Sequence, residues 1–404
     1  MALRIVASRP DPGILTLPWS TPLEEWGEEV VVPLARGLSR HVVRIVRLGS
    51  RIYAVKETQE PIAFREYRTL KDLQRLDLPT VTPHAVVTGR VDARGEELPA
   101  ALVTDHLPFS LPYRALFQHG LTADRLPTLV DALVVLLVRL HLADFYWGDV
   151  SLSNVLFRRD ASGFAAYLVD AETGELKETL SDRMREWDVE VACENVFGEL
   201  LDLQASGSVP PGESPSEVVD LLQKRYDDLW CELTEEQVFS ADELWSIEQR
   251  IERLNDLGFD VEELDIVTDY DRDTLQICPR VVEAGHHQRE LRALTGIDAE
   301  DAQARRILND IAAYTVSRDL GGLSREEVAR RWLTEIYEPI LAMIPKQAHS
   351  KLEPAQMFHE ILEHRWFMSE REGHYVKLLD AASDYFDSII PERPEEAITA
   401  PTTD

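Results

Sequence analysis

Two short apolar stretches joined by a turn, residues 155–157 and 164–169, limit how this chain can fold. The Asp-Ala-Ser-Gly turn at 160–163 predicts that the two stretches pair as an antiparallel hairpin. Asn154 directly precedes the first stretch, and Asp170 directly follows the second. Antiparallel pairing therefore brings these two polar side chains to the same edge of the hairpin.

Asp149 adds a third oxygen-bearing side chain to this edge. It lies five residues before Asn154, in the tight loop that leads into the hairpin. Carboxylate and amide oxygens suit Mg²⁺, which keeps several waters and takes further ligands from substrate phosphates. Asp and Asn beside a hairpin are also common turn formers, and taken alone these residues leave that alternative open.

A lysine closes an earlier predicted strand, residues 51–56. Strand alternation places Ala54 and Lys56 on one face, with Tyr53 on the other. A lysine at the end of an apolar face either finds a charged partner or extends its side chain to water. Both alternatives are open from this strand alone.

Glu66 is the natural partner for Lys56. It lies within the apolar stripe of a predicted helix over residues 61–76, where an unpaired buried carboxylate is costly. Alternatively, the stripe is centred on Tyr67 and Glu66 is exposed. The first alternative predicts an ion pair between Lys56 and Glu66.

Together these residues follow the order Lys, Glu, Asp-x4-Asn, Asp of protein kinases. Over residues 30–205 the sequence resembles the protein-kinase-like superfamily. It is most similar to lipopolysaccharide-kinase-like actinobacterial proteins with a C-terminal domain of unknown function, of the DUF4032 type. Segments 281–291 and 353–367 resemble that C-terminal domain.

The resemblance implies a role for each matching residue. Lys56 would contact the α and β phosphates of ATP and pair with Glu66, and Asp149 would accept or orient the proton of the acceptor hydroxyl. Asn154 and Asp170 would hold Mg²⁺. These roles make Asp149, Lys56 and Glu66 the candidate catalytic residues.

The resemblance also implies a nucleotide site. Ala54 would lie above the adenine, and the following four residues would form the hinge along its edge: Thr104, Asp105, His106 and Leu107. The loop that covers the phosphates has one glycine, Gly37, and we expect Ser39 and Arg40 to supplement its backbone donors. Asp188 falls where kinases keep a helix aspartate that supports the catalytic loop.

Several positions depart from the kinase pattern. Trp147 and Gly148 stand where His and Arg are expected, and Ala171-Glu172 replaces Phe-Gly after Asp170. Glu172 is thus either a further metal contact or a turn residue. Trp187 follows Asp170 by only 17 positions, too few for the long activation segment of protein kinases. A small hydroxylated acceptor is therefore favoured over a protein.

The charge balance excludes other classes. The 404 residues carry 42 Lys and Arg against 73 Asp and Glu, a formal charge of −31. Nucleic acids and anionic membrane surfaces need a basic face, so we expect neither as a partner. The longest apolar run, residues 132–138, is short of the roughly 20 residues of a membrane span. Without a signal-peptide pattern, we expect a cytoplasmic protein.

These observations combine into one expected architecture. It is an α+β chain with a protein-kinase-like bilobal fold, in which an N-lobe (1–105) of antiparallel sheet plus one helix precedes a mostly helical C-lobe (106–205). A linker (206–218) rich in Pro and Gly leads to an all-α C-terminal domain (219–390), and we expect a disordered tail (391–404).

The expected function is Mg²⁺-dependent transfer of phosphate from ATP to a small-molecule or sugar hydroxyl. One alternative is a pseudokinase, a nucleotide-binding scaffold whose helical domain binds an unknown protein partner. Another is transfer of AMP on the same fold. The acceptor and the oligomeric state cannot be read from the sequence.

Overall fold

The computed structural model describes residues 2–8, 11–32, 41–118, 125–207, 214–234, 237–240, 259–269 and 274–397, with Gln249 and Leu254. The chain divides into two compact units. The first comprises residues 1–158, 166–223 and 400–404, and the second comprises residues 159–165 and 224–399. The second unit thus includes the turn between the two predicted hairpin strands.

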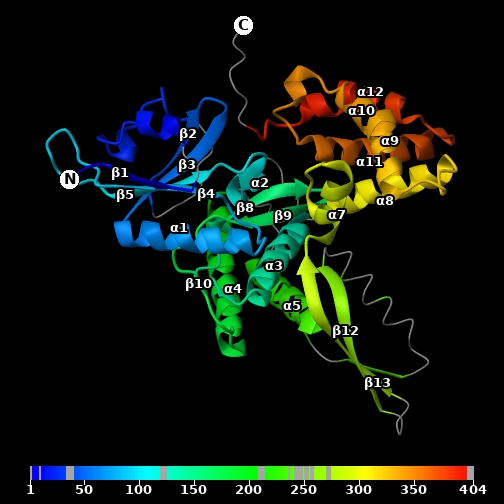
Figure 1. Ribbon diagram of the computed structural model, residues 1–404, viewed down its shortest axis with the longest axis horizontal. Coiled ribbons are helices and arrows are strands. Elements are labelled where there is room, and N and C mark those ends of the chain that lie inside the picture. The colour runs from blue at the N-terminus through cyan, green and yellow to red at the C-terminus, as the bar shows by residue number, and fades with distance from the viewer. Residues whose placement is uncertain are drawn as a thin grey trace. The chain divides into compact units, whose positions relative to one another are not determined.

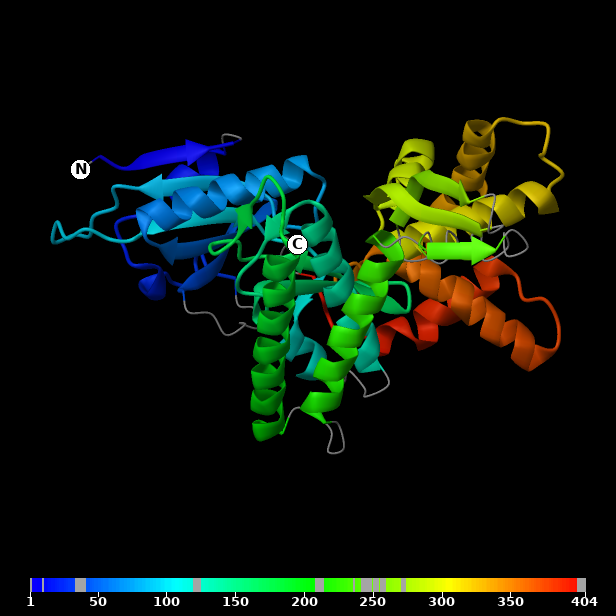
Figure 2. The same cartoon turned by 90° about the horizontal axis from the view of Figure 1, so that it is seen from below.

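A five-stranded antiparallel sheet opens the first unit (Figure 1). Its strand order is β1-β4-β5-β3-β2. The strands are β1 (Arg4–Ala7), β2 (Val43–Leu48), β3 (Arg51–Thr58), β4 (Pro83–Thr88) and β5 (Ala100–Asp105). Figure 2 shows β1, in dark blue, along one edge of the sheet.

Helix α1 (Glu60–Arg75) follows β3 and packs on one face of this sheet. Its buried side chains include Ala63, Leu70 and Leu73, at the three- and four-residue spacings of a single helix face. Glu66 lies on that same buried face. The register of the helix therefore places one carboxyl among apolar side chains.

The opposite face of the sheet is covered by the N-terminal segment. Two short 3₁₀ helices, Pro12–Thr16 and Leu23–Glu25, bring apolar side chains onto it. The resulting core combines segment and sheet residues: Ile14, Leu17, Trp19, Leu23, Trp26, Val46, Tyr53, Val55, Ala85, Val87, Ala101 and Val103. The central strands β4 and β5 are therefore buried on both faces, whereas β1, β2 and β3 are only partly buried.

The segment 110–205 combines helices with short strands, and all of it except residues 159–165 belongs to the first unit. It contains β6 (Ser110–Pro112), α2 (Tyr113–Gln118), α3 (Leu126–Leu142), β7 (Phe145–Tyr146), a 3₁₀ turn (Leu152–Asn154), β8 (Val155–Asp160), β9 (Gly163–Leu168), β10 (Glu175–Leu176) and α4 (Asp182–Ala205). Helix α3 is apolar on almost every side and forms a buried centre. Strands β6, β8 and β9 form a sheet, as the predicted hairpin requires.

Helix α5 (Pro215–Thr234) begins within the predicted linker (206–218), whose residues 208–213 lie outside the described part of the chain. A three-stranded antiparallel sheet follows, with β13 (Thr274–Ala284) between β11 (Gln237–Ser240) and β12 (Phe259–Asp269). This sheet corrects our expectation of an all-α domain from residue 219. In β13, Leu275, Ile277 and Val281 recur at even spacings, the period of a strand.

From His286 onward the second unit is helical. Its elements are α7 (His286–Thr295), α8 (Asp301–Ser317), α9 (Arg325–Trp332), a π-helical turn (Leu333–Tyr337), α10 (Glu338–Leu341), α11 (Pro354–Glu372) and α12 (Leu378–Ser388). Their core includes Trp332, Tyr337 and Phe358, whose rings pack edge to face or stacked.

The first residues of the expected disordered tail have defined structure. A 3₁₀ helix spans Ile390–Glu392, and the N–H groups of Glu396 and Ala397 both donate to the Ser350 carbonyl at 2.8 Å. Residues 398–404 lie outside the described part. Across the described residues, no helix combines the length and apolar character needed to cross a bilayer.

Candidate active site

The structure brings Lys56, Glu66 and Asp170 together. Lys56 Nζ on β3 lies 3.2 and 3.1 Å from the two carboxylate oxygens of Glu66 on α1. It lies 2.8 Å from Oδ2 of Asp170, which follows β9. One ammonium group therefore bridges the helix and the end of the hairpin.

Glu172 joins this cluster. Its Oε2 lies 3.4 Å from Lys56 Nζ and 2.9 Å from Nε2 of His41. Glu66, Asp170 and Glu172 each present an oxygen within 4.8 Å of the others, a separation that a metal ion could bridge. The sequence left Glu172 open between a metal contact and a turn residue, and the structure points its carboxylate into the cluster.

Burial and charge oppose each other in this cluster. Glu66 is fully buried, and this burial raises the pKa of its carboxyl to about 7 against the attraction of Lys56. Burial alone would lower the pKa of Lys56, but the charges of Glu66 and Asp170 outweigh it, so the net shift is upward. Lys56 therefore stays charged at neutral pH.

Asp149 and Asn154 meet in the loop before the hairpin. Asn154 Nδ2 donates to the backbone carbonyl of Asp149 at 2.9 Å and to its Oδ2 at 3.2 Å. The N–H of Val169 donates to the Asn154 carbonyl at 3.1 Å, so Asn154 lies beside the residue that precedes Asp170. The two ends of the hairpin meet as the sequence predicted.

Asp188 supports this loop from α4. Its Oδ2 accepts from the N–H of Trp147 and its Oδ1 from the N–H of Gly148, both at 2.7 Å. His141 Nε2 lies 3.3 Å from the same carboxylate, and both side chains are fully buried. The loop is therefore anchored by its backbone just before Asp149.

Sequence reasoning missed two further supports on α4. Asn195 Nδ2 donates to the Val150 carbonyl at 2.9 Å. Glu199 accepts from the N–H groups of Leu152 and Ser153, both at 2.8 Å, and from the Ser153 hydroxyl at 2.5 Å. Residues 188, 195 and 199 are spaced by seven and four positions, which places them on one helix face. That spacing is the signal by which they could have been found.

The predicted nucleotide residues are only partly described. Ala54 pairs with Thr104 across β3 and β5. The N–H of Asp105 donates to Thr82 and that of His106 to Ile52, at 2.8 and 2.9 Å. No described residue accepts a hydrogen bond from the Leu107 N–H. Gly37, Ser39 and Arg40 lie outside the described residues.

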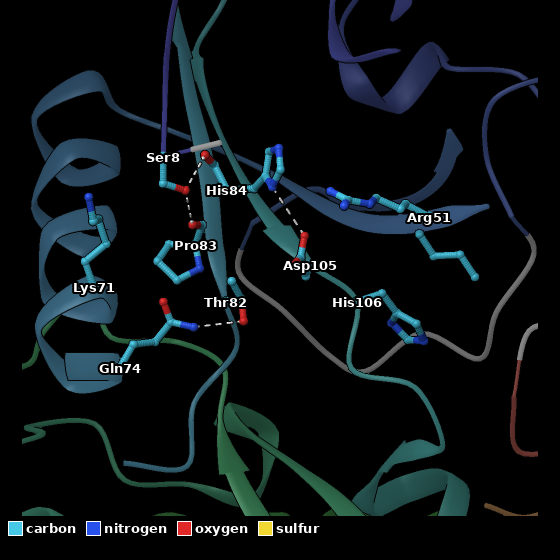
Figure 3. A pocket seen from close by; sticks show the side chains of 10 residues that line it. Ser8, Arg51, Lys71, Gln74, Thr82, Pro83, His84, Asp105 and His106 are labelled. Atoms are coloured by element: carbon cyan, nitrogen blue, oxygen red, sulfur yellow. Dashed lines mark hydrogen bonds and ion pairs between the residues drawn. The ribbon is translucent and has the colours of Figure 1, made fainter. Parts of the chain in front are cut away.

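A cavity of about 580 Å³ lies elsewhere in the first unit (Figure 3). Its lining includes Asp105 and His106 from the predicted hinge, with Arg51, Lys71 and His84, but neither Lys56 nor Ala54. Burial lowers the pKa of His106 to about 4, so this imidazole is neutral at physiological pH. The cavity is thus separate from the carboxylate cluster.

Comparison with known proteins agrees with this geometry. Residues 43–191 match the model of the lipopolysaccharide kinase (Kdo/WaaP) family, and residues 228–390 match a domain of unknown function, DUF4032. A search of curated proteins found no match. Among solved structures, the chain is similar to "WaaP in complex with acyl carrier protein", at 17% identity and a TM-score of 0.35, over 63% of this chain and 99% of that chain.

The family match and the architecture agree on the fold class. The matched segment contains β2 to β5 and α1, followed by mostly helical structure, which confirms the expected kinase-like architecture. The same match supports kinase activity and ATP use. Residues 43–191 are thus similar to the lipopolysaccharide kinase (Kdo/WaaP) family, and residues 228–390 are similar to the DUF4032 domain.

Proposed function

We propose that the first unit transfers the γ-phosphate of ATP to the hydroxyl of a small molecule or sugar, with Mg²⁺. The observation that carries this proposal is the ion-pair cluster around Lys56. One lysine faces three carboxyl groups, Glu66, Asp170 and Glu172. A divalent cation would balance the remaining negative charge, and phosphates would give Lys56 a further anionic partner.

The donor set fits Mg²⁺. Asp170 and Asn154 would hold the ion, and Glu172 would add a third oxygen. The Oε2 of Glu172 is buried and lies within 3.4 Å of the side chains of His41 and Lys56. Its position beside Asp170 and Glu66 would let a cation share these carboxylate oxygens. Bound Mg²⁺ would supply charge neutralisation and alignment of the phosphates.

Lys56 would bind the phosphates while Glu66 orients it. The side chain of Glu66 is buried among apolar residues of α1, and this packing fixes the position of its carboxylate. Its two oxygens hold the ammonium group from one side. The same ammonium group also contacts Asp170, where the phosphates and metal would meet.

Asp149 would take the proton of the acceptor hydroxyl. Asn154 donates to both the side chain and the backbone of Asp149, which holds the carboxylate in one orientation. The N–H of Leu107 would donate to the edge of the adenine. These residues would act by positioning the reactants and by stabilising charge, the two effects that dominate catalysis of phosphoryl transfer.

The short connection after Asp170 favours a small acceptor. Helix α4 begins at Asp182, only 12 positions later, and β10 (Glu175–Leu176) lies between them. Within this connection, β10 pairs with β7, so the chain between Asp170 and α4 is tied to the rest of the first unit. It offers a peptide substrate no long docking segment.

Calorimetry of ATP binding with and without Mg²⁺ tests the proposal. We expect metal-dependent binding by the wild type and binding weakened at least about tenfold in Asp170→Asn. Asp182→Asn, at an exposed position of the same unit, is the matched control and should bind as the wild type does. Asp149→Ala should retain nucleotide binding and lose transfer. A wild type that binds no nucleotide would indicate a scaffold instead.

A further inference from the structure

The turn of the β8–β9 hairpin is held by polar groups of the second unit, to which residues 159–165 belong. The Asp160 carboxylate accepts from the N–H groups of Ala302 at 3.1 Å and Gln303 at 2.8 Å. These residues begin helix α8, whose first N–H groups have no partners within the helix. Asp160 therefore caps a helix that lies some 140 residues further along the chain.

Two buried glutamines hold the turn by its backbone. Gln356 accepts from the N–H of Ala161 and donates to the carbonyl of the same residue, both at 3.0 Å. Gln303 donates to the Arg159 carbonyl at 2.8 Å and to Gln356 Oε1 at 2.9 Å. Gln303 is 0% exposed and Gln356 3% exposed. Buried amide groups are costly without hydrogen-bond partners. The backbone of the turn supplies partners to the two glutamines, and the glutamines in turn fix the turn.

Ala161 has a backbone conformation that alanine seldom adopts. Its φ is +54°, in the left-handed region that favours glycine. Strained residues of this kind persist where their surroundings over-determine them, and they gather at switches and functional sites. The paired bonds from Gln356 provide that constraint at both the N–H and the carbonyl of Ala161.

An ion pair completes the arrangement. Arg159 Nε and Nη2 lie 2.8 and 2.7 Å from Oε1 of Glu396, which is only 8% exposed. Glu396 lies beyond the last helix and is tied to the Ser350 carbonyl. The turn thus contacts side chains from α8, α11 and the C-terminal segment, each with a specific partner.

We propose that residues 159–161 act as an internal ligand of the DUF4032 domain, and that the domain thereby controls the hairpin that ends in Asn154 and Asp170. The hairpin strands β8 and β9 connect the turn directly to these two residues. A shift of the turn would therefore change the spacing of the candidate metal ligands. This second part rests on the proposed function.

Hydrogen exchange of the full chain tests the internal ligand. Gln356→Leu removes the bonds to Ala161, so we expect exchange across 155–168 to accelerate at least about tenfold. Gln347→Leu, at an exposed position of the same unit, is the matched control and should leave exchange unchanged. Unchanged exchange in Gln356→Leu would overturn the proposal. Asp160→Asn, which is nearly isosteric, provides a second test if Gln356→Leu does not fold.

Calorimetry of the same variants tests control of the metal site. We expect Gln356→Leu to weaken Mg²⁺-dependent ATP binding several-fold, with Gln347→Leu unchanged. Faster exchange at the turn with unaltered exchange at 154 and 168–170 and unaltered nucleotide binding would overturn control by the domain. If the wild type binds no nucleotide, the proposed function fails, and exchange at 154 and 168–170 alone decides whether the turn controls the hairpin.

Discussion

Single buried carboxylates determine the shape of the candidate site. Asp188 accepts hydrogen bonds from two consecutive backbone N–H groups of the loop before Asp149. Among the described residues, neither N–H donates to a backbone carbonyl, so both depend on this one side chain. The position of Asp149 therefore depends on a fully buried side chain of α4.

Replacing Asp188 with alanine tests this dependence. The change leaves two inward-facing N–H groups and His141 without their acceptor, at a cost of about 1–3 kcal/mol for each unsatisfied group. We expect the free energy of unfolding, measured by urea denaturation, to fall by about 3–5 kcal/mol. Asp188→Asn keeps one good acceptor and should lose less.

Glu190→Ala is the control for this experiment. Glu190 lies on the exposed side of α4, two residues from Asp188. Its removal should change the free energy of unfolding by less than about 0.5 kcal/mol. Equal losses in Asp188→Ala and Glu190→Ala would contradict the anchoring role.

Residues of the site were predictable where a charged side chain in an apolar stretch also matches the order of residues in kinases. Lys56, Glu66 and Asp170 stand out because charged groups next to apolar stretches are uncommon and follow a known order. Asn195 and Glu199 do not, because polar residues on a helix usually face water. Their spacing of seven and four positions along the helix places them on the face of Asp188, and the fold shows that this face meets a backbone loop.

At the scale of elements, Arg90 secures the N-terminal segment to the sheet. Its side chain is fully buried and donates to Glu57 at 2.6 Å, to the Trp19 carbonyl at 3.1 Å and to the Thr21 carbonyl at 2.7 Å. Glu57 also accepts from the N–H of Leu23 at 3.1 Å. One guanidinium thus joins strand β3 to the segment that covers it.

Arg90→Ala should release the N-terminal segment from the sheet. The substitution leaves the Glu57 carboxylate without its counter-charge, and breaking such a buried pair costs about 3–5 kcal/mol. We expect the free energy of unfolding to fall by that amount and the first 30 residues to become sensitive to protease. Arg94→Ala removes an exposed arginine of the following turn and should behave as the wild type. Undiminished protease resistance in Arg90→Ala would contradict this role.

The elements that sequence analysis missed depend on distant partners. Strand β1 spans four residues and gains its structure from pairing with β4, about 80 positions away. Its length carries too little periodicity for prediction. Strands β12 and β13 were also missed, since they lie in the region expected to be all-α. Helices α1, α3 and α11 were predictable because their apolar residues recur over several turns.

At the scale of the molecule, each unit contains a carboxyl group that resists ionisation. Burial raises the pKa of Glu66 in the first unit and of Asp160 in the second, each to about 7. The charge of Glu300 raises the pKa of Asp160 further. In a chain with a formal charge of −31, ionisation of either group adds negative charge to a buried site.

The pKa of Asp160 predicts how stability depends on pH. A carboxyl whose pKa is raised by folding holds its proton more tightly in the folded state, so its contribution is largest below about pH 4. That contribution falls as the pH rises from 4 to 7 and is constant above this range. In Asp160→Asn the group does not titrate, whereas all others do. We therefore expect the wild type to lose roughly 2–4 kcal/mol relative to Asp160→Asn between pH 4.5 and pH 8, measured by urea denaturation at each pH. A difference that is independent of pH would show that Asp160 is ionised throughout, and that the helix α8 cap stabilises its charge.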